Sequence, residues 1–126
     1  DIALSVLTTV IGHQSDRGWT ICDAGWMAMS RDRGTANQQV DQGYGIVCDA
    51  AGQVIPGLIV EQANQEHGVI ARRSGFDGEI PEFPVGTLLR ILPNHACATA
   101  AQHQHYNVIP DTADASLLRW SRFGGW

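Results

Sequence analysis

The stretch IALSVLTTVIGHQSDRGWTIC, residues 2–22, decides the fold class that the sequence predicts. Its first half, residues 2–12, is rich in β-branched side chains, which favour strands, and it ends at a glycine. The polar run QSDRG, residues 14–18, is typical of a turn, and WTIC, residues 19–22, is typical of a second strand. The two strands are therefore predicted to pair as a hairpin.

Short apolar runs separated by turn residues continue along the chain. Further strands are predicted at residues 44–48, 58–62, 67–72, 87–92 and 106–109. Residues 26–30 permit a short helix, whereas residues 31–43 and 77–84 are glycine- or proline-containing and are predicted to be loops. Strands that recur at intervals of roughly 8–12 residues are typical of an all-β protein. The sequence thus predicts a mainly β, antiparallel barrel or sandwich with short helices.

Composition restricts the classes of function. The 126 residues suit one domain, and a hydrophobic fraction of 44% with a charged fraction of 17% is typical of a globular protein. The net charge of −5 argues against nucleic acid or an anionic membrane surface as a partner. No stretch approaches the roughly 20 apolar residues of a membrane span, and no signal peptide is recognised. Three cysteines without close spacing favour a reducing, cytoplasmic location over a disulfide framework.

All eight positive charges are arginines, and the chain contains no lysine. Chemistry that needs a Schiff-base lysine must therefore take it from residues outside this sequence. The chain also begins at Asp1, without methionine, directly before an apolar run. Together these two features predict that residues 1–126 are one domain of a longer polypeptide.

The stretch PNHACATAAQHQHY, residues 93–106, holds the candidate chemistry. His95 and Cys97 are two residues apart, so in an extended segment their side chains point to the same side and can bind one ion. On a helix the same spacing separates them by about 200°. Pro93 biases Leu92 away from helix, whereas the alanine-rich run that follows can turn helical. The sequence thus predicts a strand-to-helix corner with His95 and Cys97 at its rim.

A thiolate with an imidazole suits Zn²⁺ best, with Mn²⁺ or Co²⁺ as alternatives. Two protein ligands cannot close a tetrahedral structural site, so an ion bound here would keep positions for water or substrate, as catalytic metals do. Two other interpretations stay open. The motif can be a metal-free corner, or Cys97 can be a nucleophile activated by His95, although no third group that orients the histidine is identifiable. His103 and His105 are interpreted as solvated histidines.

Three stretches together resemble a known family. PNHACATAAQHQHYNVI, residues 93–109, is similar to the signature near the C-terminus of the D-serine dehydratase and D-threonine aldolase-like enzymes. VIGHQSDRGWTICDAGWMAMS, residues 10–30, and QEHG, residues 65–68, support this resemblance. Enzymes of this family use pyridoxal phosphate (PLP) and a divalent metal on an alanine-racemase-like fold. The three stretches extend over most of the chain.

The resemblance implies a domain arrangement and a ligand set. An N-terminal TIM-like barrel would carry the PLP-binding lysine, and residues 1–126 would be the C-terminal β-domain that brings the metal to the cofactor. His95 and Cys97 match the family's two metal ligands. The aldolase branch has an aspartate two residues after the histidine, whereas this sequence has Cys97, which favours a dehydratase and a zinc-like ion.

The implied reaction is elimination of water from a D-3-hydroxy amino acid, D-serine or D-threo-3-hydroxyaspartate, to give a 2-oxo acid and ammonia. The metal would act as a Lewis acid on the leaving hydroxyl. The resemblance also implies a homodimer, and it leaves open whether the metal serves its own or the partner's barrel. The alternatives are a D-threonine aldolase-type retro-aldol lyase and a metal-free structural or dimerisation domain. Without a lysine, the chain alone is expected to be inactive.

His67 and Asp23 are candidates for contact with the substrate or with a metal ligand. The alternative for His67 is a strand-end histidine with no such role, and the alternative for Asp23 is an Asx-type turn after a strand. His13 at a predicted strand end permits either kind of role. The four tryptophans are interpreted as core or interface residues, with Trp120 and Trp126 packing on the absent barrel.

Overall fold

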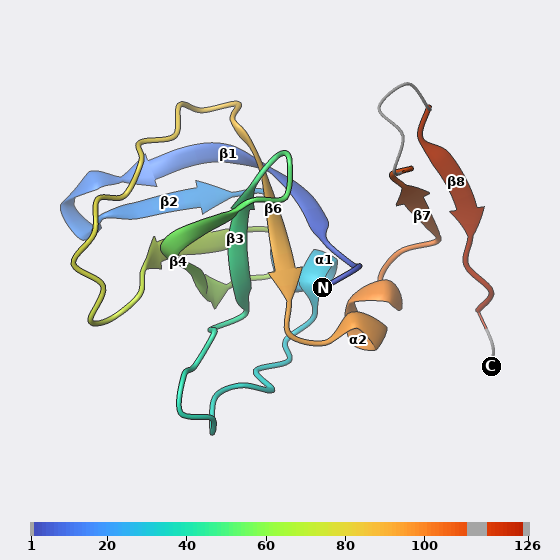
Figure 1. Cartoon of the computed structure of the whole chain (residues 1–126), viewed down its shortest axis with the longest axis horizontal. Helices are drawn as coiled ribbons and strands as arrows, with labels where there is room; N and C mark the ends of the chain where they lie inside the picture. Colours follow the sequence, from blue (N-terminus) through green and yellow to red (C-terminus); the bar gives the residue numbers. More distant parts are fainter. Residues whose placement is uncertain (1, 111–115, 125–126) are drawn as a thin grey trace.

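The predicted N-terminal hairpin is present in the computed structural model, which describes residues 2–110 and 116–124 (Figure 1). Strand β1 (Val6–Gln14) pairs antiparallel with β2 (Trp19–Cys22), and one turn of 3-10 helix, η1 (Ser15–Arg17), joins them. Gly18 ends this turn with φ 65°, a left-handed conformation that glycine adopts without steric cost. The glycine of QSDRG therefore sets the turn.

Six strands close into an antiparallel barrel in the order β1-β2-β5-β4-β3-β6 (Figure 1). The four further strands are β3 (Gly45–Asp49), β4 (Val54–Ala63), β5 (Gly68–Arg72) and β6 (Leu88–Pro93). Strand β6 closes the barrel because it pairs with β1 on one side and with β3 on the other. The prediction of a mainly β, antiparallel fold is confirmed, and the architecture is a barrel.

Side-chain alternation along the strands builds the core. In β1, Val6, Thr8 and Val10 are buried, while Leu7 is exposed. Successive side chains of a strand point to opposite faces, so every second residue fills the barrel. The buried residues of the other strands that share this core are Cys22, Val47, Leu58, Val60, Ile70, Leu89 and Ile91.

Two short helices and a second sheet complete the described chain. Helix α1 (Trp26–Met29) follows β2, and helix α2 (Ala96–Ala100) follows β6. Strands β7 (His105–Val108) and β8 (Leu118–Ser121) form a two-stranded sheet that stands apart from the barrel (Figure 1). Within residues 2–110 and 116–124, neither helix has the length and apolar character needed to cross a membrane.

Both helices lie at one end of the barrel. The start of β1 pairs with the end of β6, so the segment that leaves β6 toward α2 is at the end where the chain enters β1. The turn between β4 and β5 supports α1 at the same end, because Trp26 and Met27 donate backbone N–H bonds to the carbonyls of Asn64 and Gln65, at 2.8 and 3.2 Å. The β1–β2 hairpin lies at the opposite end.

Some elements differ from their sequence-based prediction. Strand β4 begins at Val54, before the predicted residues 58–62, although Pro56 and Gly57 follow. The β3–β4 register is irregular across this stretch, which lets the strand continue without a ladder bond from the proline. Strand β8 was not predicted, and the predicted strand at residues 106–109 pairs with β8 and not with the barrel.

The three tryptophans that the structure describes do not belong to the barrel core. Trp19 and Trp26 are half-buried, and Trp120 on β8 is 59% exposed. Trp126 lies outside the described residues. The exposure of Trp120 is compatible with the interface interpretation, and its packing on an absent barrel stays a prediction.

Candidate metal site

His95 and Cys97 lie at a strand-to-helix corner, as predicted. His95 has an extended backbone (φ −138°, ψ 100°) directly before α2, and Cys97 is the second residue of that helix. The corner is accessible, since the His95 side chain is 49% exposed and Cys97 is also exposed. The same-side argument for an extended segment does not apply to Cys97, because the helix has already begun there. The two side chains instead belong to the cap and the first turn of one helix.

Cys97 is the accessible thiol of the three. Cys22 and Cys48 are buried, and burial together with the negative charge of Asp49 raises the pKa of the Cys48 thiol. A buried thiol of raised pKa is a poor metal ligand, because the ligating form is the thiolate. Cys97 Sγ makes no hydrogen bond to His95 in the described chain, which argues against a preformed nucleophile–base pair.

The corner is held to the barrel end by hydrogen bonds. The buried Thr99 hydroxyl donates to the carbonyl of Met29 at 2.6 Å, which joins α2 to the end of α1. The Thr99 N–H donates to the carbonyl of His95 at 3.0 Å. The Asn94 amide donates to the carbonyl of Gly43 at 2.6 Å, which ties the corner to the segment entering β3. His95 therefore occupies a defined position.

Asp32 joins the site, and the sequence did not predict it. The Nδ1–H of His95 donates to Oδ2 of Asp32 at 2.6 Å. The two residues are 63 positions apart, and Asp32 belongs to the polar loop that follows α1. Nothing in a single sequence indicates this pairing, because loop residues carry no periodic signal. The contact leaves Nε2 of His95 as the nitrogen available to a ligand.

The other histidines of the motif are committed elsewhere. The Nε2–H of His103 donates to the carbonyl of Ala28 at 2.8 Å, and Nδ1 of His105 accepts from Arg119 at 3.0 Å. In the part of the chain that the structure describes, no three His, Cys, Asp or Glu residues are arranged to hold a metal. His95 and Cys97 are therefore the two candidate ligands that this corner offers among the described residues.

His67 lies in the turn between β4 and β5. Its Nε2 accepts a hydrogen bond from the side-chain amide of Asn64 at 3.0 Å. Because the carbonyls of this turn support α1, the contact serves the structure of the barrel end. This geometry favours the alternative interpretation of a strand-end histidine, and no described contact joins His67 to His95 or Cys97.

Asp23 continues the pairing of β1 with β2. Its Oδ1 accepts from the Thr8 hydroxyl at 2.7 Å and from the Thr9 N–H at 2.8 Å, while its own N–H donates to the Thr9 carbonyl at 3.1 Å. Partial burial raises the pKa of Asp23, but the hydrogen bonds from Thr9 and Thr8 outweigh it and place the pKa below its usual value of 3.8. Asp23 therefore links the end of β2 to β1 by hydrogen bonds, which is a structural role different from the alternative of an Asx turn.

Asp23→Asn is expected to lower the free energy of unfolding by about 1 kcal/mol at pH 7, since charge-assisted bonds are lost at an exposed site. A carboxylate whose folded pKa is depressed stabilises above its unfolded pKa, and this stability is lost as the pH falls through the folded value. The difference between parent and variant should therefore shrink below about pH 4. Urea unfolding at pH 7, 5 and 3 measures it, and a difference independent of pH would contradict the assignment.

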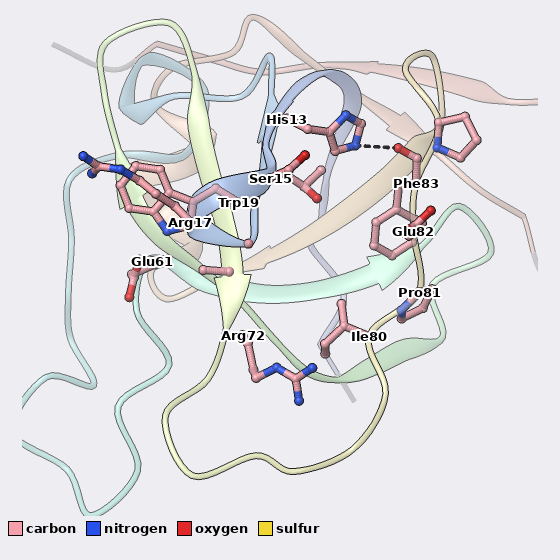
Figure 2. A pocket seen from close by; sticks show the side chains of 14 residues that line it. His13, Ser15, Arg17, Trp19, Glu61, Arg72, Ile80, Pro81, Glu82 and Phe83 are labelled. Carbon is pink, nitrogen blue, oxygen red and sulfur yellow. Dashed lines mark hydrogen bonds between the residues drawn. The ribbon is translucent and has the colours of Figure 1, made fainter.

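One cavity lies away from the predicted metal corner, at the end of the barrel that carries the β1–β2 hairpin. It has a volume of about 960 Å³ and is lined by the β1–β2 hairpin and the loop before β6 (Figure 2). His13 is in its wall, where its Nε2–H donates to the Phe83 carbonyl at 2.7 Å. Arg17 stacks over Trp19, and Arg72 donates to two backbone carbonyls. His13, Arg17 and Arg72 thus have partners within the chain, and none of the three cysteines lines this cavity.

The donor set at the corner fits a divalent metal. Thiolate sulfur and imidazole nitrogen are the ligands that zinc prefers, and a ligating histidine usually donates its other N–H to a carboxylate or a carbonyl. His95, Cys97 and Asp32 meet these requirements. A Schiff-base site for PLP does not fit this chain by itself, because the chain has no lysine.

Comparisons with known proteins identify the family of the chain. The family model "Putative serine dehydratase domain" matches residues 3–109. D-threo-3-hydroxyaspartate dehydratase from Delftia sp. (strain HT23) is 60% identical over 128 residues, covering 100% of this chain and 33% of that protein. D-serine dehydratase from Dictyostelium discoideum is 30% identical over 112 residues, covering 86% of this chain and 27% of that protein.

A solved structure of a D-threo-3-hydroxyaspartate dehydratase, a cysteine-to-alanine variant in the metal-free form, has a TM-score of 0.87 and 59% sequence identity. The match covers 97% of this chain and 32% of that one. The chain thus spans about a third of the length of these relatives. The family model covers most of the chain and confirms the resemblance carried by residues 93–109. The chain belongs to the serine dehydratase domain family.

Proposed function

We propose that residues 1–126 form the metal-carrying, C-terminal β-domain of a PLP-dependent dehydratase that acts on D-3-hydroxy amino acids. The observation that carries the proposal is the accessible corner with Cys97 and with His95 held by Asp32. The 60% identity to a D-threo-3-hydroxyaspartate dehydratase supports the reaction class. A cysteine-to-alanine variant of a D-threo-3-hydroxyaspartate dehydratase has been solved in a metal-free form, which supports a metal in enzymes of this kind.

His95 and Cys97 would hold the ion at the rim of the barrel, and zinc suits their donors better than manganese or cobalt. The ion would supply Lewis acidity to the leaving hydroxyl of the substrate, which is otherwise a poor leaving group. With only two ligands from this chain, the corner leaves room for that hydroxyl. The ion would stabilise the negative charge that develops on the leaving oxygen, and this stabilisation would grow as the C–O bond breaks. Binding that is stronger in the transition state than in the ground state accelerates a reaction.

PLP would be held by a lysine in the remainder of the polypeptide, where it supplies the electron sink for the carbanion. The length of the relatives supports this arrangement, because about two thirds of each lies outside the match. We place an N-terminal PLP-binding barrel in that part and propose a homodimer with the active site near the domain junction. The isolated chain would then be inactive.

The sheet of β7 and β8, with the residues that follow it, exposes large apolar side chains, which supports a contact between this part of the chain and another protein surface. Leu118 and Trp120 on β8 are 50% and 59% exposed, and Phe123 beyond it is 90% exposed. A two-stranded sheet is marginally stable in water by itself, and clustered exposed apolar residues mark contact surfaces. The remainder of the polypeptide, or a second subunit, would cover these side chains.

The whole enzyme that contains this chain is expected to release a 2-oxo acid and ammonia in equal amounts from D-threo-3-hydroxyaspartate or D-serine. The two D-substrates and their L-enantiomers should be compared by coupled assay of the oxo acid and by ammonia determination. Release of glycine and an aldehyde from D-threonine, without ammonia, would overturn the dehydratase assignment in favour of a retro-aldol lyase. No turnover of any hydroxy amino acid would leave a structural role for the domain.

A further inference from the structure

The contact between Asp32 and His95 calls for an explanation other than fold stability. The side chains of His95 and Asp32 are 49% and 34% exposed, and ion pairs at such sites contribute little to folding. The bond is nevertheless well formed, at 2.6 Å, and joins two segments that are far apart in the sequence. Its main physical effect is to fix the orientation of one imidazole ring.

Asp32 is itself held in position. Ser30, which ends α1, has φ 82°, a left-handed conformation that a residue with a side chain rarely adopts. Its hydroxyl accepts the Asp32 N–H at 3.3 Å. Such strained positions persist only where the surroundings enforce them, and the bond from buried Thr99 to the Met29 carbonyl fixes the same end of α1. The carboxylate and the imidazole are thus both attached to the α1–α2 contact.

The bond selects one form of the His95 ring. A carboxylate only accepts hydrogen bonds, so Nδ1 carries the proton and the lone pair of the neutral ring lies on Nε2. At His103 the opposite nitrogen is protonated, because Nε2–H donates to a carbonyl. In the described residues Nε2 of His95 makes no hydrogen bond, so it can ligate an ion without breaking a contact.

We propose that Asp32 is a positioning residue for the metal, which fixes His95 with Nε2 as the ligating nitrogen and raises the affinity of the corner for zinc. This inference rests on the proposed function, since it assigns a role at the same site. Asp32 does not touch the ion. It acts through His95, by orienting the ring and by increasing the basicity of its free nitrogen.

The test is the dissociation constant of Zn²⁺ in the whole enzyme, measured by competition with a chromophoric chelator after metal removal. Asp32→Ala is expected to weaken zinc binding by about 10- to 100-fold. Asp32→Asn should weaken zinc binding less than Asp32→Ala, because the asparagine amide oxygen can still accept the Nδ1–H bond of His95. Excess zinc should restore full occupancy in both variants. Asp16→Ala, at the opposite end of the barrel, is the matched control and should bind zinc like the parent.

The outcomes separate the inference from the proposed function. No zinc bound by the parent would refute the proposed function together with its metal site. One zinc per chain in the parent, with unchanged affinity in Asp32→Ala, would leave the site standing and refute the role of Asp32. A loss in Asp32→Ala that excess zinc does not reverse, accompanied by lower thermal stability, would identify Asp32 as a folding residue and also refute the proposal.

Discussion

His95→Ala is expected to lower kcat/KM for dehydration by at least about 100-fold in the whole enzyme, while the protein stays folded and retains PLP. Loss of a ligand removes the ion that assists departure of the hydroxyl, and removal of a single transition-state contact of this kind typically costs about 100- to 1000-fold. Folding should be little affected, because the His95 side chain is half exposed and such substitutions usually change stability by less than about 0.5 kcal/mol.

His103→Ala is the matched control for this substitution. His103 belongs to the same motif and is exposed, but its Nε2–H bonds to the Ala28 carbonyl and is not available to the metal. It should retain both metal and activity. The visible absorption of PLP should be the same in both variants, because the proposed PLP site lies in the remainder of the polypeptide. Dehydration at the parental rate in His95→Ala would refute a metal-assisted mechanism at this site.

Leu89→Ala is expected to lower the free energy of unfolding of the domain by about 3 to 5 kcal/mol. Leu89 is 1% exposed and lies in the core on β6, the strand that closes the barrel. Truncation removes buried apolar surface and leaves a cavity in a closed barrel that cannot collapse easily. Urea unfolding of the chain followed by tryptophan fluorescence gives the measurement.

The neighbouring leucine provides the control. Leu88 is on the same strand but is 47% exposed, because its side chain points to the outer face. Leu88→Ala changes the same atoms and should cost less than about 1 kcal/mol in the isolated chain. Equal losses for the two leucines would contradict the orientation of β6, and with it the position of the corner that follows the strand.

The barrel strands were predictable because they carry a local signal. β-branched runs bounded by Gly and Asp mark β2 and β3. The β-branched run of β1 was also recognised, but the strand begins at Val6 and continues through Gly12 to Gln14, beyond its predicted end. Gly18 alone indicated the turn of the hairpin at QSDRG. The early start of β4 was missed because Pro56 and Gly57 normally end a strand, and only the irregular pairing with β3 accommodates them. That pairing is a tertiary property, which local sequence does not express.

The site was predictable to the extent that it is local. His95 and Cys97 are two residues apart, so their spacing and the proline before them indicated the corner directly. His67 is hydrogen-bonded to Asn64, and Asp23 is hydrogen-bonded to Thr8 and Thr9 of β1. Both sets of contacts are within the barrel, and the local sequence did not indicate them. Asp32 could not be found in advance, since only the fold brings its loop to α2.

Metal analysis of the intact, exhaustively dialysed enzyme, beside its Cys97→Ser variant, tests the central claim most directly. The account predicts about one zinc-like ion per chain in the parent and loss of that ion in the variant, because a serine hydroxyl is a much weaker ligand than a thiolate. Barrel stability should be unchanged, since Cys97 is exposed. An enzyme that catalyses dehydration with no bound metal, or a variant that retains the ion in full, would contradict the account.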